Sequence, residues 1–420
     1  MRHIVFLLGS YYPNFSAVGY CVHQVIKCLK KDSEITVIAF RNDSSQLLED
    51  FYEGIKILRI ETEDIRRRNL LRSLGSRIAR LRTYALRARG ALKRLLAPET
   101  VDQSLISSYV ECLNSLLERP STVVPVVFPF ETVLAALEYK KTYSDVKMVP
   151  YLFDNFVDSG SLHVLGIAGR VKRKRHLRLE REMLSEADAV VSMHPLRVHF
   201  ERDFEASLVQ KIAFVEHPLL AQPEECAPRS EDGMIRLCFA GSLIRNVREA
   251  SYLVKLLRGL RVSTKVHADF FVMGNAAGRI RTQALRNSIS IVNHGCVPKR
   301  EADAAVFSAD ILLNIGEIKG KQISSKIFEY ISTGKPIVHL AYVENDAVTE
   351  ILRRYPLALC LIQDRLNFER NLKSVEEFIV SRMRSKISFA EVSAIYPEAF
   401  PEITARTLRG SEKSGRCLAQ

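Results

Sequence analysis

The segment Ser324–Leu340, "SSKIFEYISTGKPIVHL", begins with two hydroxyls and a lysine and carries a glutamate one turn later. Ser324 or Ser325 is a typical helix N-cap, and free N–H groups at a helix start can bind a diphosphate. Lys326 would add a positive charge, and Glu329 could accept two hydrogen bonds from a ribose diol. The alternative is that Lys326 and Glu329 pair at i,i+3 on a solvated face. Apolar residues flank Glu329, so its carboxylate should need a partner, which favours ligand binding.

A second group of candidates lies in "FAGSLIRNVREASYL", residues 239–253. We expect Gly241 and Ser242 to form the turn after a buried strand, with Arg245 and Arg248 at the start of a helix. Arginine forms forked contacts with phosphate oxygens, and a cation in the first turn of a helix opposes the helix dipole unless an anion is bound. The alternative is a solvated helix start, but the pattern favours phosphate binding by at least one arginine.

Three further glycines stand at strand ends, where the backbone can approach a ligand closely. Gly19 follows the first strand in "GSYYPNFSAVGY", just before a predicted helix. Gly274 lies in "FVMGNAAGRI", and Gly295 precedes a Pro-led helix, where a nucleobase could stack on the backbone. The alternative for Gly19 is an ordinary turn that needs flexibility. The GxGxxG dinucleotide fingerprint is absent.

Asp154 ends the strand-like run "KMVPYLF". A carboxylate at that point would face a cleft at the strand ends. Alternatively it caps the following turn, which aspartate does well. The sequence leaves both possibilities open.

Short apolar runs alternate with helical patterns and must position these loops. Most runs are continuously apolar, which is typical of strands buried on both faces, and the alternation predicts parallel, doubly wound sheets. The expected strands are "HIVFLL", "EITVIAF", "IKILRI", "TVVPVVF", "KMVPYLF", "AVVSM", "KIAFVE", "IRLCFAG", "DFFVMG", "ISIVNHG", "ILLNIG" and "PIVHLA". The Pro-rich, acidic segment 221–233 is the best candidate for a linker between two α/β halves.

The composition is ordinary for a soluble globular protein, with 47% hydrophobic and 26% charged residues. No apolar run is long enough for a transmembrane helix, and Ile4–Leu8 is too short for the core of a signal peptide. The eight cysteines show no CxxC pair or metal spacing, so we expect reduced cysteines in a cytosolic protein. The net charge of +13 indicates a polyanionic partner: a nucleotide, a nucleic acid or an anionic membrane.

A basic arm, residues 64–96, carries much of this charge. Arg66–Arg94 holds ten arginines and one lysine without an acid, and Leu74, Ile78 and Leu81 recur at helical spacing. Basic amphipathic helices are typical of membrane surfaces, where anionic lipid attracts about 1 kcal/mol per basic residue. The alternative is that the apolar stripe packs on the N-terminal sheet. A second basic run, "GRVKRKRHLRLER", favours membrane contact.

"SKIFEYISTGKPIV", with "FSADILLNIG" and "FAGSLIRN" upstream, resembles the retaining glycosyltransferases of family 4, which have the GT-B architecture. The amino end, "YYPNFSAVGY", resembles the start of their acceptor domain, and the similarity covers most of the chain. It implies an α/β fold of two doubly wound, Rossmann-like domains facing a central cleft. Residues 1–220 would bind the acceptor and 234–387 a nucleotide-sugar donor, while 388–410 would form a C-terminal helical segment crossing back. Neither a metal nor another cofactor is expected.

The resemblance also implies roles for single residues. Glu329 matches the family's ribose-binding acid. Relatives have another glutamate eight positions earlier that contacts the transferred sugar; Lys321 stands there in this chain, and Glu317 is nearby but off register. Arg245 and Lys326 fall near phosphate-binding positions. The expected catalytic residues are Asp154, near the reacting sugar, Arg245 and Lys326. The expected donor-binding residues are Gly19, Gly241, Ser242, Arg245, Gly274, Gly295, Ser324, Ser325, Lys326 and Glu329.

These features predict a glycosyltransferase that moves a hexose-type sugar to a saccharide, with a lipid-linked acceptor explaining the basic arm. It would be cytoplasmic and peripheral on the inner face of the plasma membrane, in polysaccharide, lipopolysaccharide or capsule synthesis. A nucleic-acid-binding protein is one alternative, but the basic runs lack interleaved aromatics and match no standard module. A GT-B-shaped nucleotide-sugar epimerase is another, although its paired acids and histidines cannot be placed.

Overall fold

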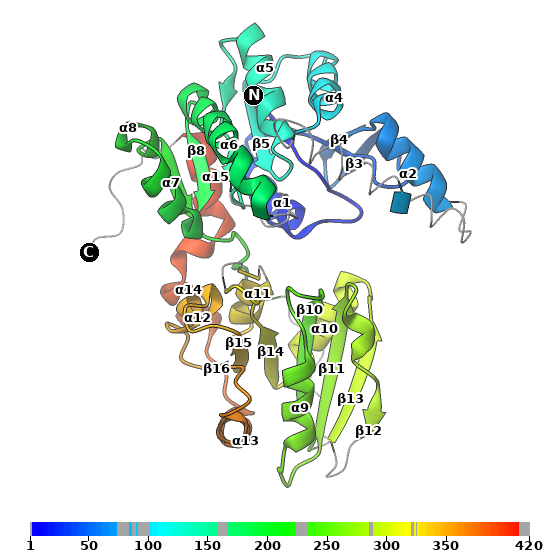
Figure 1. Ribbon diagram of the computed structural model, residues 1–420, viewed down its shortest axis with the longest axis vertical. Helices are drawn as coiled ribbons and strands as arrows, with labels where there is room; N and C mark the ends of the chain where they lie inside the picture. The colour runs from blue at the N-terminus through cyan, green and yellow to red at the C-terminus, as the bar shows by residue number, and fades with distance from the viewer. Residues whose placement is uncertain are drawn as a thin grey trace. The chain divides into compact units, whose positions relative to one another are not determined.

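The computed structural model describes residues 2–73, 84–85, 90, 101–157, 166–223, 233–284, 289–320, 323–324 and 326–410. The chain forms two compact units (Figure 1). Unit 1 comprises Met1–Pro218 and Pro401–Gln420, and unit 2 comprises Leu219–Phe400. No helix among the described residues has both the length and the apolar character needed to cross a bilayer.

Unit 1 is built on a nine-stranded sheet of order β3-β4-β2-β1-β5-β7-β8-β9, with β6 also paired to β5. Its strands are β1 (Arg2–Leu7), β2 (Ser33–Phe40), β3 (Glu49–Tyr52), β4 (Ile55–Ile60), β5 (Thr122–Val127), β6 (Lys147–Met148), β7 (Tyr151–Leu152), β8 (Val190–Met193) and β9 (Ile212–Val215). All pairs are parallel except β3–β4, which a turn with positive φ at Glu53 and Gly54 connects.

Two apolar cores cover the faces of this sheet because successive strand side chains point in opposite directions. In β1, Val5 and Leu7 enter the core formed with α4, α5, α6 and α7, while Ile4 and Phe6 enter the core formed with α1 and α15. The helices of unit 1 are α1 (Ala17–Leu29), α2 (Glu63–Ser73), α4 (Gln103–Asn114), α5 (Glu131–Thr142), α6 (Gly166–Glu186), α7 (Arg197–Asp203), α8 (Ala206–Val209) and α15 (Pro401–Arg409).

Unit 2 repeats the same plan with a seven-stranded sheet of order β12-β13-β11-β10-β14-β15-β16, antiparallel only at β12–β13. Its strands are β10 (Ile235–Ser242), β11 (Val266–Met273), β12 (Gln283–Ala284), β13 (Ile289–Gly295), β14 (Ile311–Ile315), β15 (Ile337–Ala341) and β16 (Ala358–Ile362). Its helices are α9 (Ser251–Gly259), α10 (Lys299–Ser308), α11 (Lys326–Ser332), α12 (Ala347–Leu352), α13 (Phe368–Arg382) and α14 (Phe389–Ile395). Helices α9 and α13 cover one face.

Every strand expected from an apolar run is present, although "KMVPYLF" forms two short strands, β6 and β7, on either side of Val149 and Pro150. Three strands were not expected: β3, β12 and β16. β3 is a polar edge strand and β12 has two residues, so neither has a strong apolar pattern. Both exist because they pair antiparallel with a neighbouring parallel strand.

The C-terminal segment divides at Pro401 and not at residue 388. Helix α14 and the 3-10 turn Pro397–Ala399 belong to unit 2, whereas α15 packs against α1 in unit 1. The apolar face of α15 explains this, since Ala405 and Leu408 join the core of α1. Of the predicted linker, only residues 221–223 and 233 are described, and Leu74, Ile78 and Leu81 of the basic arm lie outside the described residues.

Candidate functional site

The parallel strands of unit 2 follow the order of a Rossmann fold, with β10 and β14 at its centre. From β10 the chain proceeds through β11 and β13 on one side, and from β14 through β15 and β16 on the other. Open α/β sheets bind ligands at such a switch point, outside the carboxyl ends of the strands. The segments that follow β10 and β14 carry Arg245, Glu317 and Lys326, so the sequence candidates of this unit gather at that place.

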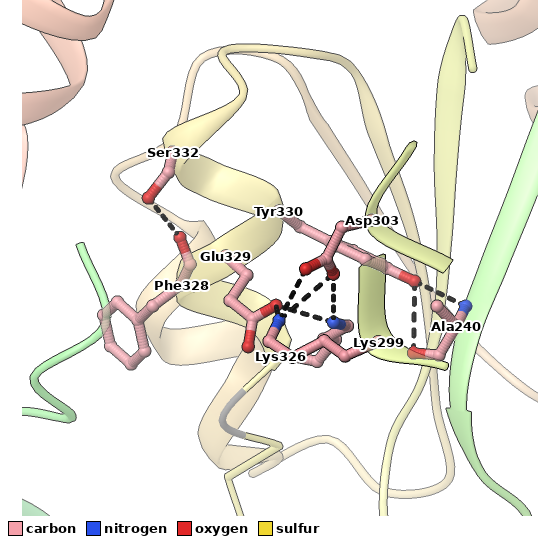
Figure 2. A network of polar contacts seen from close by, with 8 residues as sticks. All are labelled: Ala240, Lys299, Asp303, Lys326, Phe328, Glu329, Tyr330 and Ser332. Carbon is pink, nitrogen blue, oxygen red and sulfur yellow. Dashed lines mark hydrogen bonds and ion pairs between the residues drawn. The ribbon is translucent and has the colours of Figure 1, made fainter. Parts of the chain in front are cut away.

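Two lysines and two carboxylates form an ion-pair cluster between α10 and α11 (Figure 2). Lys326 Nζ lies 2.6 Å from Glu329 Oε2 and 3.2 Å from Asp303 Oδ1. Lys299 Nζ lies 3.1 Å from the same Glu329 oxygen and 2.9 Å from Asp303 Oδ2. The Lys326–Glu329 pair offered as an alternative is thus present, but not on a solvated face, since the two side chains are 20% and 21% exposed.

Electrostatics make this cluster a stable arrangement of charges. Partial burial acts to lower the pKa of Lys299, but the carboxylates of Glu329 and Asp303 outweigh it, and the pKa is raised. Lys299 is therefore a cation at neutral pH, and the four side chains form a pre-positioned set of hydrogen-bond donors and acceptors. Such a set can exchange partners with a ligand that carries both an anion and hydroxyl groups.

Helix α11 is fixed to the sheet by its buried residues. The backbone N–H of Ala240, in β10, donates to the Tyr330 hydroxyl at 2.7 Å (Figure 2). At the end of the helix Gly334 has φ +71°, and a Cβ there would lie 2.0 Å from the carbonyl oxygen of Ile387. Lys335 then donates to carbonyls at the C-terminus of α10, including that of Ala309 at 2.6 Å. The Gly-Lys-Pro break therefore ties α10 to α11, and Lys335 has a structural role.

The loop after β10 differs from its predicted form. Gly241 and Ser242 are the last residues of β10 and pair with β11, so the expectation that they form the turn is wrong. The turn is a tight hairpin in which Ile244 and Arg248 exchange backbone hydrogen bonds around Asn246, whose φ is 63°. Because α9 begins only at Ser251, the expectation that Arg245 and Arg248 occupy the first turn of a helix is also wrong.

The two arginines of this hairpin have different surroundings. The Arg245 side chain is exposed, and its backbone N–H donates to Asn275 Oδ1 at 2.8 Å. Arg248 turns inward: burial lowers the pKa of its guanidinium, and the nearby carboxylates of Glu317 and Asp346 oppose this. Among the described residues, Arg248 Nε has no hydrogen-bond partner. Arg248 is therefore a partly buried cation in the loop that follows β10, and Arg245 is a solvated one.

A buried polar chain supports the loop that contains Glu317. Asn314 Nδ2 lies 2.8 Å from His339 Nδ1, and His339 Nε2 lies 2.9 Å from Asp346 Oδ1. Burial acts to raise the pKa of Asp346, but hydrogen bonds from His339 and the backbone of α12 outweigh it and lower the pKa. The same carboxylate caps α12. This chain fixes the β14 and β15 ends around the switch point.

Packing explains two of the candidate glycines, Gly274 and Gly19. Gly274 has φ +103°, and a Cβ there would lie 2.3 Å from the carbonyl oxygen of Leu243, so it joins the loops after β10 and β11. Gly19 is the third residue of α1 and does not precede the helix as expected. Its N–H donates to the capping Ser16 Oγ at 3.0 Å, and a Cβ would lie 2.3 Å from the Ser10 carbonyl oxygen. Gly295 ends β13, ahead of the Pro-led helix α10.

The carboxyl edge of the sheet in unit 1 holds two buried titratable groups, Asp154 and His217. Asp154 follows β7, where burial raises the pKa of its carboxyl to about 6. No described residue makes a hydrogen bond to Asp154, so the alternative in which it caps the following turn is not seen among them. His217 follows β9 against the Phe153 ring, with centroids 6.2 Å apart, and burial lowers its pKa to about 4.

The loop of Asp154 is held by its neighbours in unit 1. Phe156 stacks on Phe130 at a centroid distance of 4.0 Å. Glu180 accepts a hydrogen bond from the backbone N–H of Val157 and lies 2.7 Å from His199 Nε2. These contacts fix the backbone that follows Asp154, whose own carboxyl group is desolvated.

Some sequence candidates are not tested by this geometry. Ser325 and Lys321 lie outside the described residues, and Ser324 is partly buried, with its carbonyl accepting from the Ile327 N–H at 2.9 Å. Sequence reasoning missed Lys299 and Asp303. Their i,i+4 spacing in the Pro-led helix was visible, but nothing local indicated that they meet Glu329. No group of three His, Cys, Asp or Glu side chains in the described part of the chain could hold a metal ion.

Comparison with solved structures identifies the fold. The chain superposes on sucrose-phosphate synthase from Thermosynechococcus elongatus with a TM-score of 0.59 and 9% identity, covering 98% of each chain. An OtsA structure gives 0.59 and 9%, with 99% and 100% coverage, and the lipopolysaccharide outer core galactosyltransferase WaaB gives 0.53 and 11%, with 98% and 99% coverage. No family model matches the chain, and no curated protein is significantly similar in sequence. The chain therefore has the GT-B fold of these glycosyltransferases.

Proposed function

We propose that this protein is a retaining glycosyltransferase of the family 4 type, which transfers a hexose-type sugar from a nucleotide-sugar donor to a saccharide acceptor. The observation that carries the proposal is the Lys326–Glu329 pair at the switch point of unit 2. A cation and a carboxylate at that place suit a molecule that joins a diphosphate to a ribose. The GT-B fold and the "SKIFEYISTGKPIV" motif support the same function.

The residues of unit 2 would bind the donor as follows. Glu329 accepts hydrogen bonds from the ribose diol, and Lys326 turns to the diphosphate. Arg245 or Arg248 supplies a second cation. Negative charge grows on the diphosphate as the glycosidic bond breaks, and a cation fixed before the reaction stabilises that charge without reorganising. Arg248 suits this role because its side chain is partly buried and the hairpin fixes its backbone.

Unit 1 would bind the acceptor, with Asp154 near the reacting sugar. Because burial raises its pKa to about 6, the carboxyl is ionised at neutral pH but readily accepts a proton. That is the property needed of a group that takes a proton from an attacking hydroxyl or holds it in place.

The basic arm supports a lipid-linked acceptor and an anionic membrane surface on the cytoplasmic side. At its start Ile65 is buried, whereas Leu70 is 61% exposed, so an apolar side chain points away from the unit 1 core. We expect the protein to float with anionic liposomes and to be released by salt, which screens the attraction. Replacing Leu74, Ile78 and Leu81 by serine should release it without lowering the Tm. A large fall in Tm would mean instead that the arm packs on the sheet.

The central test is a panel of nucleotide sugars, read by released nucleoside diphosphate and by the anomeric configuration of the product. We expect one donor to be hydrolysed or transferred, with activity that survives a chelator. The Glu329→Gln variant should bind nucleoside diphosphate about tenfold or more weakly at an unchanged Tm, because a charged hydrogen-bond acceptor is lost. Equal affinity in the variant would contradict the ribose role, and restoration of chelator-treated enzyme by Mg²⁺ or Mn²⁺ would contradict metal independence.

A further inference from the structure

Lys299 and Asp303 are placed to control the carboxylate of Glu329. Both lysines of the cluster approach the same oxygen, Glu329 Oε2, at 2.6 and 3.1 Å. Within the described part of the chain, the other oxygen, Oε1, accepts no hydrogen bond. The Oε2 side of the carboxylate is thus held by two lysines, and the Oε1 side can accept a hydrogen bond from a ligand.

An anionic ligand would change the contacts of Lys326 but not those of Lys299. Its two lysines and two carboxylates cancel in formal charge. If Lys326 turns to a diphosphate, Glu329 loses its shorter hydrogen bond, and only Lys299 still bridges Glu329 and Asp303. Without Lys299 two neighbouring carboxylates would face each other with no cation between them, and they would repel each other.

The positions of these residues make Lys299 a rigid clamp. Lys299 is the first residue of α10, and Asp303 lies one turn later on the same helix. Helix α11, which carries Glu329, is tied to β10 through Tyr330 and to α10 through Lys335. The contacts of Lys299 therefore join α10 to a helix that other hydrogen bonds already hold in place; Figure 2 shows the contacts of Lys299 with Asp303 and Glu329.

We propose that Lys299, itself held by Asp303, is a positioning residue that keeps Glu329 aligned for the ribose diol while Lys326 moves to the diphosphate. This inference rests on the proposed function. It gives Lys299 and Asp303 the role of orienting Glu329, which is distinct from binding phosphate. It predicts that loss of Lys299 damages recognition of the ribose more than recognition of the phosphates.

The test compares UDP, ADP and GDP with their 2′-deoxy forms by calorimetry, since the deoxy forms lack one hydroxyl that Glu329 would bind. In the parent protein we expect a ribose preference of about tenfold. Lys299→Met should reduce that preference to about twofold at most, and Lys299→Arg should restore much of it. Lys373→Met is the matched control, because Lys373 forms an exposed i,i+4 pair with Glu377 in the same unit, and it should leave the preference unchanged.

The outcomes separate the inference from the proposed function. If the parent binds none of these nucleotides, the proposed function fails and the inference falls with it. If the parent prefers ribose and Lys299→Met keeps the full preference, even at a lower Tm, the pair is merely structural and the inference alone is wrong. Should Lys299→Met fail to fold, Asp303→Asn decides: a reduced ribose preference supports the clamp, and an unchanged preference overturns it.

Discussion

The two sheets share the central strand order of a Rossmann fold, with β6 and β9 as additional strands in unit 1, but their carboxyl edges hold charged groups in different ways. In unit 2 the candidate groups are paired, with Lys326, Glu329, Lys299 and Asp303 within hydrogen-bond distance of one another. In unit 1 Asp154 has no hydrogen-bond partner among the described residues, and burial raises its pKa to about 6.

This difference indicates two kinds of task for one scaffold. Paired charges can exchange partners with a charged ligand, because each hydrogen bond that is lost is replaced by another. A lone, desolvated carboxyl has no partner to exchange, and its environment tunes its proton affinity instead. Under the proposed function, unit 2 would bind an anionic molecule, and unit 1 would carry out proton chemistry on a less charged molecule.

The largest effect should follow from Asp154→Asn. We expect kcat to fall roughly 10²- to 10⁴-fold, the range for general acid–base groups, with nucleoside diphosphate affinity unchanged. The pH profile gives a second readout. Asp154 is ionised only above its raised pKa, so parent activity should rise as the pH passes about 6, and the variant should lose this rise. A variant that instead loses nucleotide affinity but keeps the full kcat would contradict the catalytic role of Asp154.

Lys326→Met should weaken nucleoside diphosphate binding about 10- to 100-fold, because a hydrogen bond to a charged group is lost from a partly buried site. Calorimetry measures the affinity, and the Tm controls for folding. If binding is unchanged, the cluster of unit 2 is a structural ion-pair network and not a ligand site.

Arg245→Ala should have a smaller effect, lowering kcat about two- to fivefold, since exposed charges contribute little. Arg248→Met should lower kcat more than this, because its side chain is partly buried in the loop that follows β10. Steady-state kinetics on both variants measure how much a solvated cation and a partly buried cation each contribute to kcat. The reverse order would assign the phosphate contact to the hairpin tip.

The smallest effect concerns salt. Raising ionic strength from about 0.05 M to about 0.5 M should weaken nucleotide binding to unit 2, because screening acts on its partly exposed charges. The pH inflection near 6 should move little over the same range, since burial causes the shift of Asp154. A salt-dependent inflection would show that a neighbouring charge, and not burial, sets this pKa.

Local patterns predicted much of the fold. Continuous apolar runs gave twelve strand regions, because strands buried on both faces tolerate few polar residues. The hairpin at Ile244–Arg248 was missed, since "IRNVREASYL" is compatible with an early helix start and only backbone pairing across Asn246 delays α9 to Ser251. Packing also explains Gly19 and Gly274. A Cβ atom at these positions would overlap the carbonyl oxygens of Ser10 and Leu243, and the sequence does not show that these residues come so close.

The helical spacing of the two local ion pairs, Lys299–Asp303 and Lys326–Glu329, is already present in the sequence, although only the second pair was considered from it. Only the tertiary structure decided that they merge. Lys299 and Glu329 are 30 residues apart in the sequence, and they meet because the fold brings the start of α10 close to α11. Likewise, the sequence placed Asp154 at a strand end, but its raised pKa depends on burial by residues remote in the chain. Charge spacing is local, whereas desolvation and convergence are properties of the packed fold.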